Sequence, residues 1–181
     1  MIKAWALADF IVEFIVKEDG EERPATWIIW TDGSSNQQAG KAGVLLQLPK
    51  GDTIECAVCL QFFCLQFSTT NNEAEYEAIL SGLDLAKAAG AMSVVIHYNS
   101  QVFVRHINGD YKAKGERMRE YLSMIKRKMG EGLLANFVQI PREKNKQADR
   151  LAKVASTECM VVINHVLFFI QYSPIIDKVE V

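Results

Sequence analysis

The feature that most constrains the fold is a change of hydrophobic period near the middle of the chain. Residues 72–89 are mostly helix formers, with small and apolar side chains at helical spacing, and Gly90 follows as a candidate C-cap. The next run, Ser93–Tyr98, is rich in β-branched residues without a polar alternation, which is typical of a strand covered on both faces. A helix that feeds directly into such a strand indicates a sheet flanked by helices.

The segments on either side extend this pattern. Three short β-rich runs, at 27–31, 43–48 and 53–60, come first and predict an antiparallel meander. After the central strand, the periodicity predicts helices at 101–107 and 117–129, a strand at 137–140 and a last helix at 146–155. We therefore expect an α/β fold with a five-stranded mixed sheet, three antiparallel strands and then parallel ones, flanked by helices.

The length and the end segments suggest one domain with two extensions. A chain of 181 residues can bury one substantial core. Residues 1–23 begin apolar and end in a charged stretch before Pro24, which is typical of a linker. We expect an N-terminal extension at 1–25, the domain at 26–157 and a C-terminal extension at 158–181.

Composition limits the classes of partner. The net charge of −2 gives no overall basic surface, so nucleic-acid contacts would have to be local or made through metal ions. Lys3, Asp9 and Glu13 interrupt the apolar N-terminus, and the apolar run 160–170 is shorter than the roughly 20 residues of a membrane helix. We expect no membrane association, and a cytoplasmic or nuclear location.

The chain has four cysteines, and two of them, Cys56 and Cys59, form one C-x-x-C pair. This pair could indicate zinc or redox chemistry. Positions three apart in a strand face opposite sides of a sheet, and no second pair follows at zinc spacing. We expect buried or half-buried thiols in a reducing compartment.

Three acidic residues, Asp32, Glu75 and Asp149, are candidates for a functional site. Asp32 follows the first β-rich run and could be either a functional carboxylate or a turn-forming Asp before Gly33. Glu75 heads the apolar stripe of the helix at 72–89, so its side chain should face inward, although a first-turn Glu is also favoured by the helix dipole. Glu73 and Glu77 should face elsewhere, toward solvent.

Asp149 lies in the first turns of the last helix, beside that helix's apolar stripe. Taken alone this is weak evidence, because Asp is common at helix starts. Clustered carboxylates need cations to coexist, and oxygen ligands of this kind suit Mg²⁺. If Asp32, Glu75 and Asp149 meet, they could hold two ions about 3.5–4 Å apart for phosphodiester cleavage.

Four stretches carry a family resemblance. They read TDGSS at 31–35, TNNEAEYEA at 70–78, NSQ at 99–101 and IPREKNKQADRLA at 140–152. In this order and spacing the chain resembles the type 1 ribonuclease H domain, and most closely the ribonuclease H region of plant gypsy-type LTR retrotransposon polyproteins. The resemblance covers roughly residues 26–156, and sequence on both flanks also looks like polyprotein sequence. It implies a ribonuclease H-like fold.

The resemblance also implies a two-metal endonuclease that cuts the RNA strand of an RNA–DNA hybrid, with Mg²⁺, or Mn²⁺, as cofactor. The family's metal-binding carboxylates fall on Asp32, Glu75 and Asp149, and the fourth catalytic position falls on Asn99. The family motif there reads Asp-Ser-Gln. Asparagine removes a full negative charge from the metal site, so we expect weakened or absent activity. Asn99 could also serve as a helix N-cap after the strand.

Substrate contacts carry over from the same resemblance. Asn71, Asn72 and Gln101 match positions that face the minor groove of the hybrid, where amides can meet 2′-hydroxyls and base edges. Asn71 or Asn72 could instead cap the helix, and Gln101 could be a solvated first-turn residue. The expected partners are an RNA–DNA hybrid and an upstream reverse transcriptase domain in a polyprotein, and we expect a monomer.

Three functions therefore remain open from the sequence. The chain could be a ribonuclease H hydrolase with a poor fourth ligand at Asn99, a non-catalytic domain that binds hybrid or RNA, or a structural spacer in a larger polyprotein. Cleavage in Mg²⁺ or Mn²⁺ separates the first from the other two, and a gel shift with hybrid separates the second from the third.

Overall fold

A computed structural model describes residues 25–36, 39–60, 70–100, 103, 116–155 and 165–177 of the chain. The strands are β1 (Thr26–Ser35), β2 (Gly40–Gln47), β3 (Thr53–Leu60), β4 (Ser93–Tyr98), β5 (Leu134–Gln139) and β6 (Val166–Gln171). The helices are α2 (Asn71–Ala88), α4 (Glu116–Gly130) and α5 (Lys146–Val154), with short 3-10 turns η1 (Arg142–Lys144) and η2 (Ile175–Asp177).

These strands form one mixed sheet in the order β5-β4-β1-β2-β3-β6. The first three pair antiparallel, as a meander should, while β4 lies parallel to β1 and β5 lies parallel to β4. This arrangement confirms the predicted α/β class and the antiparallel-then-parallel sheet. The three helices predicted at 72–89, 117–129 and 146–155 also form, within two residues at each end.

The prediction of five strands was wrong, because the apolar run near the C-terminus adds a sixth. β6 pairs parallel with the outer edge of β3, from Glu55 opposite Val166 to Leu60 opposite Gln171. Leu167 and Phe169 on its inner face pack against the hydrophobic core. An alternating apolar strand beside an unpaired edge satisfies both its side chains and the open backbone groups of β3.

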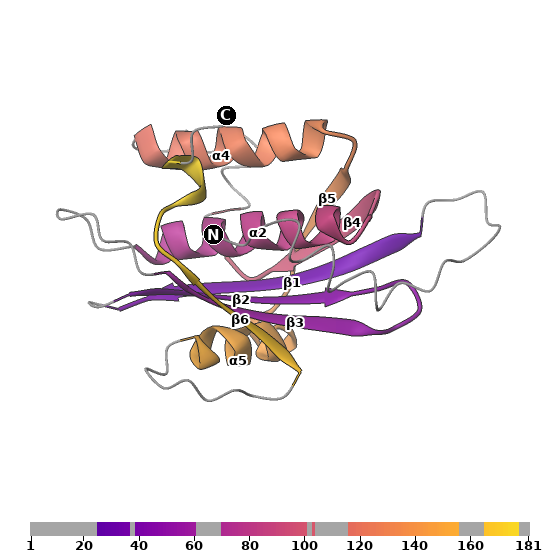
Figure 1. The fold of residues 1–181 in the computed structure, drawn as a ribbon, viewed down its shortest axis with the longest axis horizontal. Coiled ribbons are helices and arrows are strands. Elements are labelled where there is room, and N and C mark those ends of the chain that lie inside the picture. The colour runs from indigo at the N-terminus through magenta and orange to yellow at the C-terminus, as the bar shows by residue number, and fades with distance from the viewer. Residues whose placement is uncertain are drawn as a thin grey trace.

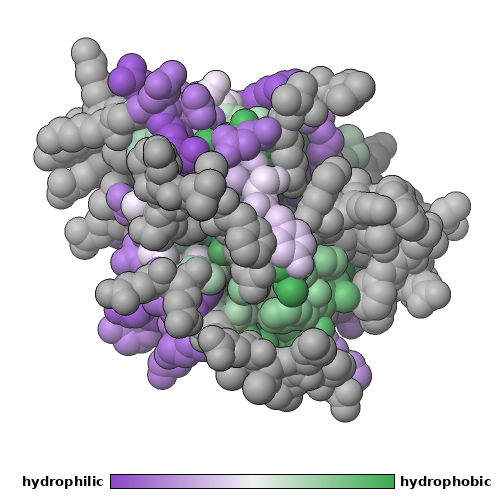
Figure 2. All heavy atoms as spheres, turned by 60° about the vertical axis from the view of Figure 1, so that its left-hand side comes forward, coloured by the Kyte–Doolittle hydropathy of each residue, from purple (hydrophilic) through white to green (hydrophobic). Residues whose placement is uncertain are grey.

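The sheet separates two layers of helix (Figure 1). Of the described helices, α2 and α4 lie on one face and α5 lies on the other. The core fills the space between the sheet and α2, and Ile29, Val44, Val58 and Ile96 from four neighbouring strands contribute to it. In Figure 2, where α4 is again at the top, the surface there is hydrophilic and an apolar area lies lower, at the level of the sheet.

The start and end of α2 are fixed by its own sequence. Thr70 is the N-cap, and it forms a reciprocal capping box with Glu73. This corrects the alternative in which Asn71 or Asn72 caps the helix. At the other end Gly90 has a φ of +89° and donates to the carbonyl of Lys87, as a glycine just past a helix end should.

Two expectations about burial can also be checked. In β4 the α2 side is fully buried, but Ser93, Val95 and His97 on the α5 side are only half-buried, so the strand is less covered than its sequence suggested. Cys56 and Cys59 are both buried thiols, as expected. Burial raises the pKa of the Cys56 thiol to about 12.

Some expectations fall outside the described part of the chain. They concern the predicted helix at 101–107, except Phe103, and the cysteines Cys64 and Cys159. Within the described residues, no helix is both long and apolar enough to span a membrane.

Candidate active site

The structure brings Asp32, Glu75 and Asn99 to one small hollow. They line it together with Ser100 and with residues of β1, α2 and β4, namely Thr31, Gly33, Ile79 and Tyr98. Its volume of about 10 Å³ is close to that of a single water site. Residues from three separate stretches of the chain therefore converge where β4 ends and β1 continues past it.

Two glycines make this convergence possible. A Cβ at Gly33 would lie 2.3 Å from the backbone carbon of Ala74, so only glycine lets α2 pack directly on β1 beside Asp32. A Cβ at Gly43 would lie 2.1 Å from the carbonyl oxygen of Ala148, which shows an equally close approach of α5 to β2. The Asn145 amide, which donates to the carbonyl of Thr31 at 2.8 Å, fixes the start of α5 to β1.

The hollow raises the pKa values of its carboxylic acids. Burial is the main cause of the raised pKa of Asp32; a hydrogen bond from Asn99 opposes it, and the charge of Asp149 adds to it. Burial also raises the pKa of Glu75 to about 7, with a further contribution from Asp32 and an opposing hydrogen bond from Ser100. Two acids that repel each other in a partly dry site form an environment that favours a cation.

Asn99 contacts Asp32 directly. Its Nδ2 donates to Oδ1 of Asp32 at 3.3 Å, which is a long hydrogen bond. The amide thus stabilises the charge of Asp32 in the way a cation would, and it occupies one of the oxygens that a cation would need. Ser100 Oγ accepts from the backbone N–H of Phe103 at 3.4 Å. The capping alternative for Asn99 stays a prediction, because the helix that it would cap lies outside the described residues.

Asp149 lies near this group without joining it. Its charge acts on Asp32, but its Oδ2 pairs with Nζ of Lys153 at 2.7 Å. Accordingly, no set of three or more His, Cys, Asp or Glu side chains in the described ranges is arranged to hold a metal ion. Lys153 is three-quarters exposed, and an exposed pair of this kind contributes about 0–1 kcal/mol, so Asp149 can leave it at little cost.

The donor set fits a divalent cation in part. Asp32 and Glu75 supply two oxygen ligands at one hollow, which is the number of carboxylates that Mg²⁺ commonly uses. Asp149 could join after rotating away from Lys153, whereas Asn99 now presents its amide hydrogens to the site. The role of these four residues in catalysis and metal binding stays a prediction.

The predicted substrate-binding residues are placed unequally. Asn71 Oδ1 accepts from both the backbone N–H and the hydroxyl of Ser35, at 2.8 and 2.9 Å, which ties the start of α2 to the end of β1. Asn72 is exposed beside it, and Gln101 lies outside the described residues. Their contact with a nucleic acid stays a prediction.

Sequence reasoning misplaced two acids and missed two polar residues. Glu73 and Glu77, expected in solvent, are both buried on the α4 side of α2. Ser100 and Asn145 were missed, although both lie inside stretches that carry the family resemblance. Helical spacing did separate Glu75 from Glu73 and Glu77, but it could not show that α4 covers the second face.

Comparisons with known proteins agree with this architecture. The reverse transcriptase-like family matches residues 30–155. A ribonuclease HI of Halobacterium salinarum is 28% identical over 129 residues, covering 68% of this chain and 61% of that protein. A bifunctional protein of Mycobacterium tuberculosis is 31% identical over 86 residues, and the chain spans only about a quarter of its length.

Solved structures also indicate a ribonuclease H-like fold. A ribonuclease H1 from Halobacterium salinarum superposes with a TM-score of 0.64 at 22% identity, over 72% of this chain and 96% of that one. The ribonuclease H1 called LC11, crystallised in complex with an RNA/DNA hybrid, gives 0.61 at 34% identity, over 71% and 94%. The chain therefore belongs to the reverse transcriptase-like family and contains a ribonuclease H-like domain.

Proposed function

We propose that this protein is a ribonuclease H-type endonuclease that hydrolyses the RNA strand of RNA–DNA hybrids, with activity weakened by Asn99. The observation that carries the proposal is the meeting of Asp32 and Glu75 at one hollow, with Asp149 close enough to raise the pKa of Asp32. The likeness to a ribonuclease H1 crystallised with an RNA/DNA hybrid supports the choice of substrate.

The expected chemistry divides between the cation and the protein. A bound Mg²⁺, or Mn²⁺, would activate water and offset charge on the phosphodiester. Asp32 and Glu75 would hold it by their carboxylates, and Asp149 would join once Lys153 releases it. With a pKa of about 7, Glu75 carries a proton in about half of the molecules near neutral pH, so cation binding there releases protons.

Asn99 weakens this arrangement in two ways. It contributes no negative charge to a site whose cation affinity depends on charge, and its amide holds an oxygen of Asp32. Loss of one such electrostatic interaction typically costs about 10²–10³ in rate. The native chain should therefore cleave slowly, if at all.

The test is a cleavage assay on the full chain beside its Asn99→Asp variant. The substrate is a labelled RNA–DNA hybrid in Mg²⁺ and, separately, in Mn²⁺. We expect a gain of about 10²–10³ in the variant, with Asp32→Asn in the same background as the inactive control. Equal activity of the two chains would show that Asn99 is not the cause of weakness, and absence of cleavage in both would remove the enzymatic proposal.

A second candidate function is binding of the hybrid without cleavage. It is favoured by the two contacts that already satisfy the acids without an ion, from Asn99 to Asp32 and from Lys153 to Asp149. A gel shift with uncleaved hybrid at low salt tests it, with duplex DNA as the control. Binding by an inactive Asn99→Asp chain would favour this function, and absence of binding would leave a structural role.

The context of the protein is also a proposal. We infer an origin in a gypsy-type retrotransposon polyprotein, with a reverse transcriptase domain upstream. The family match and the sequence motifs at 31–35, 70–78 and 140–152 support it.

A further inference from the structure

The C-terminal part of the described chain crosses the molecule from one layer to another. β6 lies at the sheet edge, and residues 172–177 then rise past the sheet to reach α4 (Figure 1). Leu167 and Phe169 pack on the core, and Ile175 is itself a buried core residue. We name residues 166–177 the strap.

A buried carboxylate fastens the strap to α2. Glu77 has no exposed surface, and its oxygens accept hydrogen bonds from Tyr121 Oη at 2.7 Å, Gln171 Nε2 at 2.8 Å and the backbone N–H of Ile175 at 2.9 Å. Two of these donors belong to the strap and the third belongs to α4. A buried charge is tolerable only with donors of this kind, so the strap must be docked for Glu77 to be satisfied.

Arg117 makes a second connection between the same elements. Its Nε pairs with Glu73 Oε1 at 2.6 Å, and its Nη1 lies 3.8 Å from Oδ2 of Asp177 at the end of the strap. Glu73 also closes the capping box of α2 with Thr70. The first turn of α2 is therefore tied to α4 and to the end of the strap through Glu73 and Arg117.

The other side of this same turn carries Glu75. Residues 73, 75 and 77 alternate along the helix, so Glu73 and Glu77 face α4 and the strap while Glu75 faces Asp32 and Ser100. A helix turn is stiff, and a shift of its α4 side moves the opposite side with it. Misplacement of a catalytic group by about 1 Å can cost about 10² in rate.

We propose that the strap is a positioning element for the site, and that Glu77 and Gln171 are positioning residues that set the place of Glu75. This proposal rests on the proposed function for its catalytic consequence. It also extends the folded unit to Asp177, beyond the matched family region at 30–155.

The test uses the full chain with Gln171→Leu, which replaces the amide donor with an apolar side chain of similar size. Amide hydrogen exchange of the first two turns of α2 is the readout. We expect at least tenfold faster exchange there in the variant than in the parent chain.

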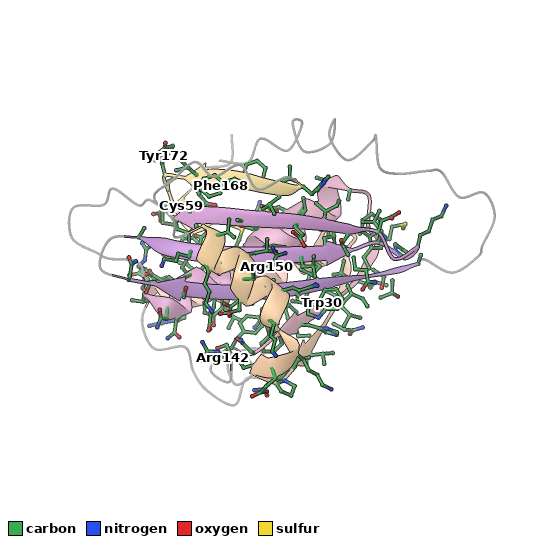
Figure 3. All side chains as sticks on the ribbon, turned by 90° about the horizontal axis from the view of Figure 1, so that it is seen from below. Trp30, Cys59, Arg142, Arg150, Phe168 and Tyr172 are labelled. Carbon is green, nitrogen blue, oxygen red and sulfur yellow. The ribbon has the colours of Figure 1, made fainter. Side chains whose placement is uncertain are left out.

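Two controls separate positioning from general loss of stability. Phe168→Ala alters the outward, part-exposed face of the same strand (Figure 3), and Ile54→Val weakens the core elsewhere. Neither should speed the exchange of these two turns as much as Gln171→Leu does. If Gln171→Leu does not fold, Glu77→Gln replaces it, since it keeps the size of the side chain and one acceptor oxygen.

The outcomes are distinct from those of the proposed function. A folded Gln171→Leu chain with unchanged α2 exchange overturns the strap proposal, as does an equal change of exchange in Ile54→Val. Cleavage is measured separately in the Asn99→Asp background, where Gln171→Leu should lower kcat about tenfold or more with little change in KM. Absence of cleavage in the Asn99→Asp parent counts against the proposed function alone, because hydrogen exchange still decides the role of the strap.

Discussion

Two acids on the same helix, Glu75 and Glu77, lie in opposite electrostatic situations. Glu77 is completely buried and accepts hydrogen bonds from a tyrosine, a glutamine and a backbone N–H. Glu75 is only partly buried, next to Asp32, and its pKa is raised to about 7. The more buried carboxylate is thus the better satisfied one.

The difference teaches how structural and functional acids can be told apart. A carboxylate whose donors are built into the fold stabilises the fold and has no capacity left for a ligand. A carboxylate that shares a hollow with another acid destabilises the protein until a proton or a cation arrives. Burial alone would have ranked these two residues in the wrong order as site candidates.

The largest expected effect is a loss of stability when Glu77, the fully hydrogen-bonded acid, is replaced. Glu77→Ala leaves three donors unpaired in the interior, at about 1–3 kcal/mol each, so we expect a loss of about 3 kcal/mol or more in the free energy of unfolding. Urea unfolding measures it, with the exposed Glu120→Ala on α4 as the control. A loss below about 1 kcal/mol would mean that Glu77 does not hold the strap to α2.

Replacement of Glu75 is expected to raise the free energy of unfolding instead of lowering it. Because its folded pKa lies above the unfolded one, the folded state binds the extra proton, and stability falls as the pH rises from about 4.5 to 7. Glu75→Gln removes this loss, so it should stabilise the metal-free chain by about 1–3 kcal/mol at pH 8 and by almost nothing at pH 4. Unfolding at both pH values checks this, with the exposed Glu143→Gln as control. A destabilised variant at pH 8 would contradict the comparison.

Magnesium should act on the site that contains Glu75 and not on Glu77. At an ion concentration ten times the dissociation constant, binding to the folded chain adds about 1.4 kcal/mol. The added stability should be larger in Asn99→Asp, lost in Asp32→Asn, and unchanged in Phe168→Ala. Thermal unfolding with and without MgCl₂ measures it. Equal stabilisation of Asp32→Asn would place the ion elsewhere.

The smallest effect is expected at the N-cap of α2, where Thr70 forms the capping box with Glu73. Thr70→Ala removes the side chain that accepts from the backbone N–H of Glu73, which should cost about 1 kcal/mol. Thr53→Ala, at an exposed strand start, is the matched control. A cost as large as that of Glu77→Ala would show that the cap, and not the buried acid, holds this end of α2.

Much of this arrangement could be predicted from local sequence. The period of residues 72–89, the capping glycine at 90 and the β-branched run at 93–98 specify their elements through nearest-neighbour geometry, and the structure has them there. The inward face of Glu75 followed from the same helical count. The sixth strand did not, because an apolar run of this length fits an edge strand and a docking segment equally well.

What the sequence by itself determined, then, is the order of the elements and which acid of α2 points toward the sheet, since both depend on backbone period alone. Only the tertiary structure decided that Glu77 is buried and that Asn99 occupies an oxygen of Asp32. Both depend on contacts between side chains that come from distant parts of the chain. No periodicity along the sequence encodes such a meeting, because it is fixed by how the layers pack.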